Sequence, residues 1–206
     1  MNNPWLEIPV EEYESHMLTI GQLQIMNQLM AQAFQKYKPA NVAILGCASG
    51  NGFEHLNYSE LQNVYGVDIN SYYLKVLKDR YQNQISKLKL LCLDIENDSL
   101  AINYIDCYFL SLILEYVSPL PLIQKIQPSL NPDGKICLII QENTSSDFVS
   151  KTSYESLEQL SAIAKTIDKN TIIVLMENQG FCMDFYSEHP CKAGKILIYM
   201  EFSIAK

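Results

Sequence analysis

The sequence predicts an α/β fold built around a mostly parallel sheet. Between residues 42 and 140, short apolar runs rich in β-branched residues alternate with amphipathic stretches. Strands that alternate with helices form βαβ units, which give parallel strands and helices on both faces of the sheet. Residues 181–206 differ, because two strand-like runs there surround a turn without an intervening helix. Two strands joined so closely are antiparallel, since a parallel pair needs a crossover.

Two helices are predicted ahead of the first strand. The stretch PVEEYESHM begins with a proline and two acids, which suit the first turn of a helix. Its helical spacing puts Tyr13, His16 and Met17 on one face. In TIGQ, Thr19 and Gln22 have the spacing of a capping box, so a second helix is expected to begin there and to end at KYKP.

Five strands are expected in the alternating part of the chain, and the tail adds two more. The five apolar runs cover residues 42–45, 64–68, 88–94, 107–114 and 135–140. Helical patterns occupy residues 52–56, 71–81, 120–130, 152–167 and 168–180, and NPDG at 131–134 predicts a turn. We expect one compact unit, with residues 1–38 as a helical cap and residues 39–206 as the α/β domain.

Composition and charge exclude several classes of function. The chain has 206 residues, 48% of them apolar and 18% charged, which is typical of a folded globular domain. Its net charge of −8 repels a phosphate backbone, and no cluster of Lys and Arg offsets it, so nucleic acid is not an expected partner. The sequence shows neither an apolar stretch of membrane-spanning length nor a signal-peptide pattern at its start. We therefore expect no membrane association and a cytoplasmic location, whereas nothing in the sequence fixes the oligomeric state.

The six cysteines predict neither a disulfide framework nor a metal site. They are scattered without a C-x-x-C pair, and most lie in apolar runs, where a free thiol behaves as a small hydrophobic group. Cys182, His189 and Cys191 come nearest to a metal cluster, but their spacing fits no familiar zinc pattern. We expect no bound metal.

A glycine-rich turn and the carboxylates that follow it are the main functional signal. VAILGCASGNG runs from a strand into a loop at the carboxyl edge of the sheet, where open α/β sheets bind ligands. Asp68 ends the next strand, so its carboxylate is expected beside the loop, where it can accept hydrogen bonds from both hydroxyls of a ribose. Asp94 ends the third strand, where it can accept from an adenine amino group while the Ile95 N–H faces a ring nitrogen. Each feature alone also suits a turn or a helix cap, but their shared edge favours a nucleotide-type site.

The loop favours an adenosine ligand without phosphates. The pattern G-x-G-x-x-G is absent, because the glycines are Gly46, Gly50 and Gly52, with Ala48 between the first two. The P-loop pattern is absent as well, and no Lys or Arg lies near the loop to hold a pyrophosphate.

VAILGCASGNG, YGVDI, LCLDI and LSLILEYV together resemble the ordered motifs of the class I S-adenosylmethionine-dependent methyltransferases. The resemblance covers residues 42–206. It implies a Rossmann-like, seven-stranded, mostly parallel sheet of order 3-2-1-4-5-7-6, with strand 7 antiparallel, helices on both faces and an N-terminal helical cap that shapes the substrate site. It also implies S-adenosylmethionine as the cofactor. The cofactor-binding positions that it implies are Gly46, Cys47, Ala48, Gly50, Asp68, Ile69, Asp94, Ile95 and Ser111.

Two positions depart from the family pattern. Ile44 stands where an acidic residue is usual, and Ala48 replaces the middle glycine. The methyl group of Ala48 is expected to be tolerated if the backbone there has a negative φ.

The methyl acceptor is expected to be a small molecule. The tetrapeptide N-P-P-Y of amino-methylating nucleic-acid enzymes is replaced by LEYV after the fourth strand, and a protein side chain is the alternative acceptor. Groups that could take a proton from the acceptor are His16 and Tyr13 in the cap, with Glu115 and Tyr116 after the fourth strand; His16 and Glu115 are preferred.

Two other functions stay open. A Rossmann sheet can carry an NAD-dependent oxidoreductase, although the missing G-x-G-x-x-G and the antiparallel tail oppose it. A non-catalytic member of the methyltransferase fold, which binds a cofactor or a partner without turnover, is kept open by Ile44 and Ala48.

Overall fold

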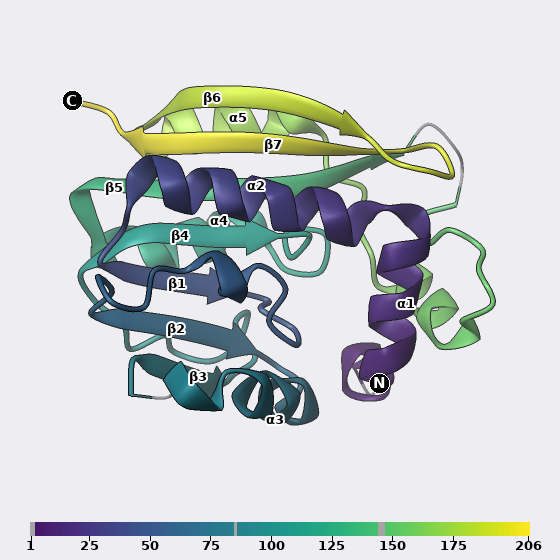
Figure 1. Ribbon diagram of the computed structural model, residues 1–206. Coiled ribbons are helices and arrows are strands. Elements are labelled where there is room, and N and C mark those ends of the chain that lie inside the picture. The colour runs from purple at the N-terminus through teal and green to yellow at the C-terminus, as the bar shows by residue number, and fades with distance from the viewer. Residues whose placement is uncertain (1–2, 85, 144–146) are drawn as a thin grey trace.

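The computed structural model describes residues 3–84, 86–143 and 147–206, which form a seven-stranded sheet of order β3-β2-β1-β4-β5-β7-β6 (Figure 1). The strands are β1 (Asn41–Leu45), β2 (Asn63–Asp68), β3 (Leu88–Cys92), β4 (Ile105–Ser111), β5 (Leu130–Asn143), β6 (Phe181–Pro190) and β7 (Lys195–Ile204). Strands β1 to β5 pair in parallel, whereas β7 is antiparallel to both β5 and β6. The predicted fold class is therefore confirmed, including the strand order and the reversed strand.

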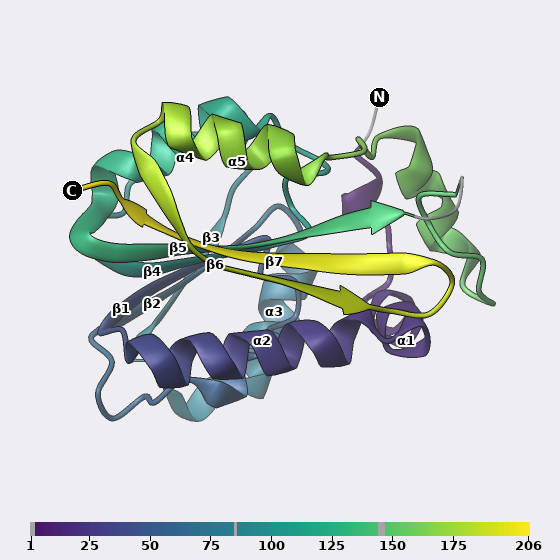
Figure 2. The same ribbon diagram turned by 90° about the horizontal axis from the view of Figure 1, so that it is seen from above.

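Helices cover both faces of this sheet. The α-helices of the described residues are α1 (Val10–Ile20), α2 (Gln22–Tyr37), α3 (Ser71–Arg80), α4 (Pro119–Ile126) and α5 (Lys169–Asn178). Helices α2 and α3 lie on one face, and α4 and α5 lie on the other (Figure 2). Helix α1 lies beyond the carboxyl ends of the parallel strands, so only this part of the predicted cap covers the sheet edge. None of these helices is both long enough and apolar enough to cross a bilayer.

The central strand β4 shows why the sheet needs helices on both sides. Successive side chains of a strand point to opposite faces, and the neighbours Tyr108 and Phe109 are both fully buried. Phe109 packs in the cluster that contains Phe34 of α2, while Tyr108 packs in the cluster that contains Ile126 of α4. Continuous apolar runs of this kind are typical of parallel strands that are buried on both faces.

The capping box predicted for α2 is wrong. Helix α1 continues through Thr19, whose hydroxyl donates to the Ser15 carbonyl oxygen at 2.7 Å. The helix ends at Gly21, which has a φ of +85° and is therefore in the left-handed region that glycine adopts readily. Gln22 is consequently the first residue of α2, and its side chain is buried.

The turn predicted at NPDG is also wrong, because residues 131–134 lie inside β5. The pairing of β5 with β4 shifts register opposite Ile105–Cys107, and such an irregularity tolerates a proline that has no N–H to donate. The helices predicted at 52–56 and 152–167 are shorter 3-10 helices, at Phe53–His55 and Glu155–Ala162.

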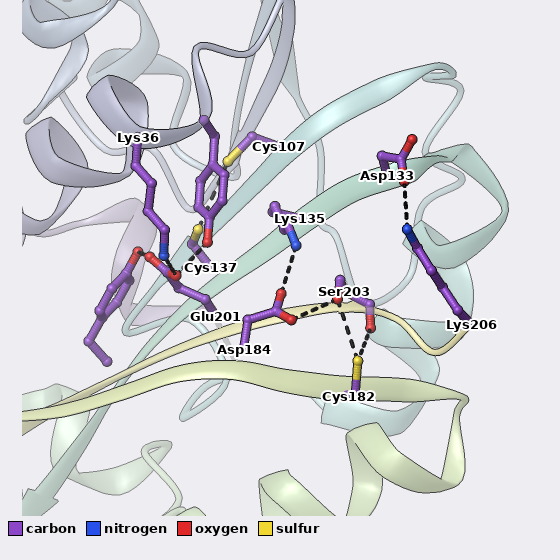
Figure 3. A network of polar contacts seen from close by, with 12 residues as sticks. Lys36, Cys107, Asp133, Lys135, Cys137, Cys182, Asp184, Glu201, Ser203 and Lys206 are labelled. Carbon is purple, nitrogen blue, oxygen red and sulfur yellow. Dashed lines mark hydrogen bonds and ion pairs between the residues drawn. The ribbon is translucent and has the colours of Figure 1, made fainter.

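A buried carboxylate on β7 connects this strand to α2 (Figure 3). Glu201 of β7 is 3% exposed, and one of its oxygens accepts hydrogen bonds from the Lys36 ammonium and the Tyr37 hydroxyl. Its other oxygen accepts from the Tyr199 hydroxyl at 2.7 Å. A buried charge is tolerated only when hydrogen bonds replace its hydration, so this network fixes how α2 docks.

We predict that Tyr37→Phe lowers the free energy of unfolding by about 1.5–3 kcal/mol, the usual effect of losing a hydrogen bond to a charged group. Tyr58→Phe is the matched control, because the buried Tyr58 hydroxyl has no partner among the described residues. Removal of the Tyr58 hydroxyl is expected to leave the free energy of unfolding unchanged or to raise it. Urea titrations of both variants measure this, and equal losses would contradict the assigned role of Glu201.

Candidate functional site

A cavity of about 180 Å³ lies at the carboxyl edge of the parallel strands. One buried water needs only about 10–15 Å³, so this space can hold a ligand of many atoms. Residues at the ends of β1 to β4 form one side of it, namely Gly46, Ala48, Asp68, Ile69, Asp94, Ile95 and Ser111. Helix α1 and residues 148–163 supply the other walls, so the cavity lies where open α/β sheets bind ligands.

The glycine loop begins with a tight turn that keeps its backbone near this edge. The N–H groups of Gly46 and Cys47 both donate to the Val67 carbonyl oxygen, at 2.9 and 3.1 Å. Gly46 has a φ of +68°, and a Cβ there would lie 3.0 Å from Ile113 Cδ1. A side chain at this position would therefore be strained and would crowd a neighbour that also lines the cavity.

Two predicted loop residues do not line the cavity. The side chain of Cys47 packs in the core between α2 and the sheet, where burial and then the Asp68 charge raise the pKa of its thiol well above the usual value. The N–H of Gly50 donates to the Cys47 carbonyl oxygen at 3.0 Å, so Gly50 shapes the turn. Ile44 is also buried in this core, where an apolar side chain suits its surroundings.

Ala48 adopts the left-handed backbone conformation, with a φ of +44°, so the condition of a negative φ, under which its methyl group was expected to be tolerated, is not met. Its N–H donates to Asp68 Oδ2 at 2.8 Å. This hydrogen bond requires the Ala48 N–H to point toward β2. The left-handed conformation, which is strained for an alanine, gives the N–H that direction. Leu112, which follows β4 and also lines the cavity, has a φ of +53°. Backbone strain of this kind concentrates at functional sites.

Asp68 is positioned by two backbone hydrogen bonds. Oδ2 accepts from Ala48, and Oδ1 accepts from the Asn70 N–H at 2.9 Å. Burial raises the pKa of Asp68 to about 6, although the backbone hydrogen bonds oppose the rise. The group is therefore ionised at neutral pH, and each oxygen can accept a further hydrogen bond from a ligand.

Asp94 and Ile95 lie at the end of β3 and both line the cavity. The Asp94 carboxylate accepts from the Glu96 N–H at 3.0 Å and from the Asn97 side-chain amide at 2.8 Å, so it also stabilises the turn after the strand. The Ile95 N–H donates to none of the residues that the structure describes. It therefore remains free to contact a ligand at this edge.

Buried polar atoms without partners gather in this cavity. Among the described residues, four buried side-chain oxygens lack a hydrogen bond, and three of them belong to Ser111, Glu115 and Ser150, which all line it. Leaving a buried polar group unpaired costs about 1–3 kcal/mol each, so native proteins rarely do so away from a binding site. The three atoms point to a polar ligand as their missing partner.

Glu115 is the most deeply buried of these groups. It is 0% exposed, and its Oε1 accepts from the Gln141 N–H at 2.7 Å while Oε2 is the unpaired oxygen. Burial raises its pKa from the ordinary 4.5 to about 7, and the hydrogen bond from Gln141 opposes the rise. Its proton can therefore be gained or lost near neutral pH.

His16 and Tyr13 reach the cavity from α1. His16 is buried, its Nδ1 lies 3.0 Å from Thr152 Oγ1, and burial followed by the Lys195 charge lowers its pKa. The imidazole is therefore neutral and able to accept a proton. Burial, and then the charge of Asp68, raises the pKa of Tyr13 above its ordinary value, so its phenol is a hydrogen-bond donor at neutral pH.

Several lining residues were not identified from the sequence. Gln22 donates from its side-chain amide to Gln141 Oε1 at 2.5 Å, and Gln141 donates in turn to the Phe148 carbonyl oxygen at 3.0 Å. Trp5 and Ser150 complete the walls. These residues come from distant segments with no shared motif, so only the tertiary structure brings them together. Among all the residues that the structure describes, no group of three His, Cys, Asp or Glu side chains is placed to hold a metal.

Ala48→Gly is predicted to raise the free energy of unfolding by about 0.5–1 kcal/mol. Relief of left-handed strain, about 1–2 kcal/mol, exceeds the extra flexibility that glycine gives the unfolded chain, about 0.4–1 kcal/mol. Ala101→Gly, at an exposed position outside the left-handed region, is expected to lose stability instead. Urea unfolding of both variants tests the sign, and a loss of stability for both would contradict the strain at Ala48.

Glu115→Gln is predicted to gain stability relative to the wild type as pH rises. In the wild type, the folded state binds the Glu115 proton more tightly than the unfolded state, because its folded pKa is about 7 against an ordinary 4.5. Stability therefore falls between about pH 4.5 and pH 7, by roughly 3 kcal/mol, whereas glutamine has no such dependence.

Unfolding free energies of Glu115→Gln and the wild type at pH 4.5 and pH 8 measure this difference. The exposed Glu60→Gln variant is the control. The difference in unfolding free energy between Glu115→Gln and the wild type should grow from pH 4.5 to pH 8. If it does not grow, Glu115 is not buried as described.

Part of the sequence matches a known protein family. Residues 44–138 match the family model described as a methyltransferase domain. No curated protein matches the sequence significantly.

Solved structures share the fold at low sequence identity. The mitomycin 7-O-methyltransferase MmcR is 15% identical with a TM-score of 0.64, and the match covers 89% of this chain but 54% of that one, so this chain spans about half its length. An O-methyltransferase from a trans-AT PKS multienzyme of Brevibacillus brevis, in complex with S-adenosyl-L-homocysteine, is 14% identical with a TM-score of 0.65, covering 87% of this chain and 72% of that one. The [4+2]-cyclase SpnF is 10% identical with a TM-score of 0.66, and the match covers 87% of this chain and 81% of that one.

Identities this low establish the fold, and a cyclase among the matches shows that the fold alone does not set the reaction. The family resemblance of the sequence motifs is nevertheless confirmed by the domain match and by the strand order. The chain therefore has the fold of the class I S-adenosylmethionine-dependent methyltransferases, and residues 44–138 match the model of a methyltransferase domain.

Proposed function

We propose that this protein transfers a methyl group from S-adenosylmethionine to a small-molecule acceptor. The observation that carries the proposal is the Asp68 carboxylate, held by the Ala48 N–H beside a cavity that has no Lys or Arg among its described lining residues. A ribose offers two hydroxyl donors to such a carboxylate, while a pyrophosphate would find no positive charge there. The polar and charged groups of the cavity thus fit an adenosine without phosphates.

The residues at the strand ends would contact different parts of this cofactor. Asp68 would accept from the ribose hydroxyls, and Asp94 with the Ile95 N–H would face the adenine. The backbone of Gly46 and Ala48, with Ile69 and Ser111, would line the rest of the ligand, while Cys47 and Gly50 would act by shaping the loop. When bound, S-adenosylmethionine supplies a methyl group on a positively charged sulfur, which suits a cavity lined by carboxylates.

His16 and Glu115 are our candidates for accepting a proton from the acceptor, and Tyr13 for orienting it as a hydrogen-bond donor. The imidazole is neutral because burial lowers its pKa, and the carboxyl has a pKa of about 7, so both groups can accept a proton, as a general base requires. The walls from α1 and residues 148–163 enclose the cavity, so we propose an acceptor of limited size. We keep the cytoplasmic location as a proposal from the sequence.

Two alternatives are distinguished by binding and turnover. An NAD-dependent oxidoreductase should bind NAD, which the lining charges oppose. A non-catalytic member of the fold would bind the cofactor and yet methylate nothing in a broad acceptor screen. Ile44 and Ala48, which depart from the family pattern, are the observations that keep this alternative open.

Calorimetric titration with S-adenosylhomocysteine, beside NAD, tests the proposal. We predict that S-adenosylhomocysteine binds and that Asp68→Ala weakens it by about 1.5–3 kcal/mol, roughly ten-fold or more, because hydrogen bonds to a charged group are lost. Asp79→Ala, an exposed carboxylate on α3, should leave the affinity unchanged. Thermal melts confirm that each variant is folded.

Two results would contradict the proposal. One is wild-type protein that binds NAD but not S-adenosylhomocysteine. The other is a folded Asp68→Ala variant that keeps the full affinity.

A further inference from the structure

Four aromatic side chains line one part of the cavity. Trp5 packs edge-on against Tyr13, with ring centroids 5.8 Å apart, and against Tyr116, with centroids 5.1 Å apart. Tyr116 packs edge-on against Phe148 at 6.2 Å. We call these four residues the aromatic strip. Aromatic faces attract organic cations, most strongly where water is excluded.

The charged side chains that line the cavity have one sign. Its lining residues include the carboxyl groups of Asp68, Asp94, Glu96 and Glu115, and none of the described lining residues is Lys or Arg. Lys195 and Lys125 do not line the cavity, although their ammonium groups donate to the carbonyl oxygens of the lining residues Phe148 and Ile95. His16 is neutral because burial lowers its pKa. An acceptor that carries a carboxylate or phosphate would therefore be repelled, whereas one that carries a positive charge would be attracted.

Glu115 lies at the same end of the cavity as part of the aromatic strip. It directly precedes Tyr116, and Gln141 connects it to Phe148, since the Gln141 backbone donates to Glu115 and its side chain donates to the Phe148 carbonyl oxygen. Asp68 lies at the end of β2, and β2 and β4 are separated by β1, a spacing of roughly 10 Å. The Glu115 end is thus separate from the Asp68 end, where the ribose is proposed to bind.

Oε2 of Glu115 needs a donor, and Ser150 offers an unpaired hydroxyl in the same cavity. An ammonium group supplies up to three N–H donors and a positive charge, so it can satisfy this oxygen while lying against the aromatic strip. The apolar side chains of Leu157, Leu160 and Ile163 provide a surface for an apolar body attached to that group.

We infer that the methyl acceptor is an amine on an apolar or aromatic body, and that it binds as an ammonium between Glu115 and the aromatic strip. The ammonium would pass a proton to the Glu115 carboxylate, and the freed lone pair of the nitrogen would form the bond to the methyl carbon as the bond from that carbon to sulfur breaks, which leaves S-adenosylhomocysteine. This inference rests on the proposed function, because it assigns the second substrate of the same site. Glu115 is then the residue that selects amines over alcohols and acids of the same shape.

The test uses three probes with one skeleton, 3-phenylpropylamine, 3-phenylpropanol and 3-phenylpropionate, titrated calorimetrically into the protein saturated with S-adenosylhomocysteine. The amine is expected to bind about ten-fold more tightly than the alcohol, and the carboxylate is expected not to bind. Glu115→Gln keeps the shape of the side chain and should remove most of the advantage of the amine. Glu96→Gln, which removes another carboxylate of the same cavity, is the matched control and should retain it.

The outcomes separate this inference from the proposed function. If the wild type does not bind S-adenosylhomocysteine, the proposed function fails. If it does bind, then a carboxylate probe that equals the amine, an amine that does not bind, or a folded Glu115→Gln variant that keeps the preference overturns the inference alone. Thermal melts and the S-adenosylhomocysteine affinity of Glu115→Gln show whether that variant is intact.

Discussion

The Asp68 carboxylate joins parts of the chain that meet at the carboxyl edge of the sheet. One oxygen holds the glycine loop through the Ala48 N–H, and the other accepts from Asn70. Asn70 caps α3 through its side-chain oxygen, and its side-chain amide donates to the Trp5 carbonyl oxygen at 2.8 Å. Loop, strand end, helix start and N-terminal segment are therefore positioned by one connected set of hydrogen bonds. A ligand that contacts Asp68 acts on all four segments.

Several energetically costly features meet at the same edge, although left-handed residues also occur elsewhere, at Lys38, Tyr104 and Ala193. Asp68 and Glu115 are carboxyl groups whose burial raises their pKa, and Ala48 and Leu112 have left-handed backbones. Each of these features destabilises the folded chain by itself. Elsewhere the core is apolar, and the buried Glu201 is fully paired. The contrast argues that the edge is shaped for binding rather than for stability.

The sequence predicted well those features that depend on local patterns. Apolar runs located every strand, and the ends of β1, β2 and β3 placed the glycine loop, Asp68 and Asp94 at one edge. It failed where tertiary contacts override local preference, as at the NPDG segment inside β5. The side of the cavity proposed for the acceptor, with Trp5 and Phe148, could not be found in the same way, because segments far apart in the chain meet there without a common motif.

The two sides of the cavity are built in different ways, although the sequence named candidate residues, such as Asp68 and Glu115, on both. The Asp68 side is built by consecutive strand ends, which the fold positions in any chain with this topology. The Glu115 side is built by α1, the residues after β4 and the segment after β5, which packing brings together in this chain. A fold that also supports a cyclase can keep the first side and change the reaction through the second. We therefore connect the choice of the proposed acceptor to the unpaired atoms of Glu115 and Ser150, because those groups still need a partner.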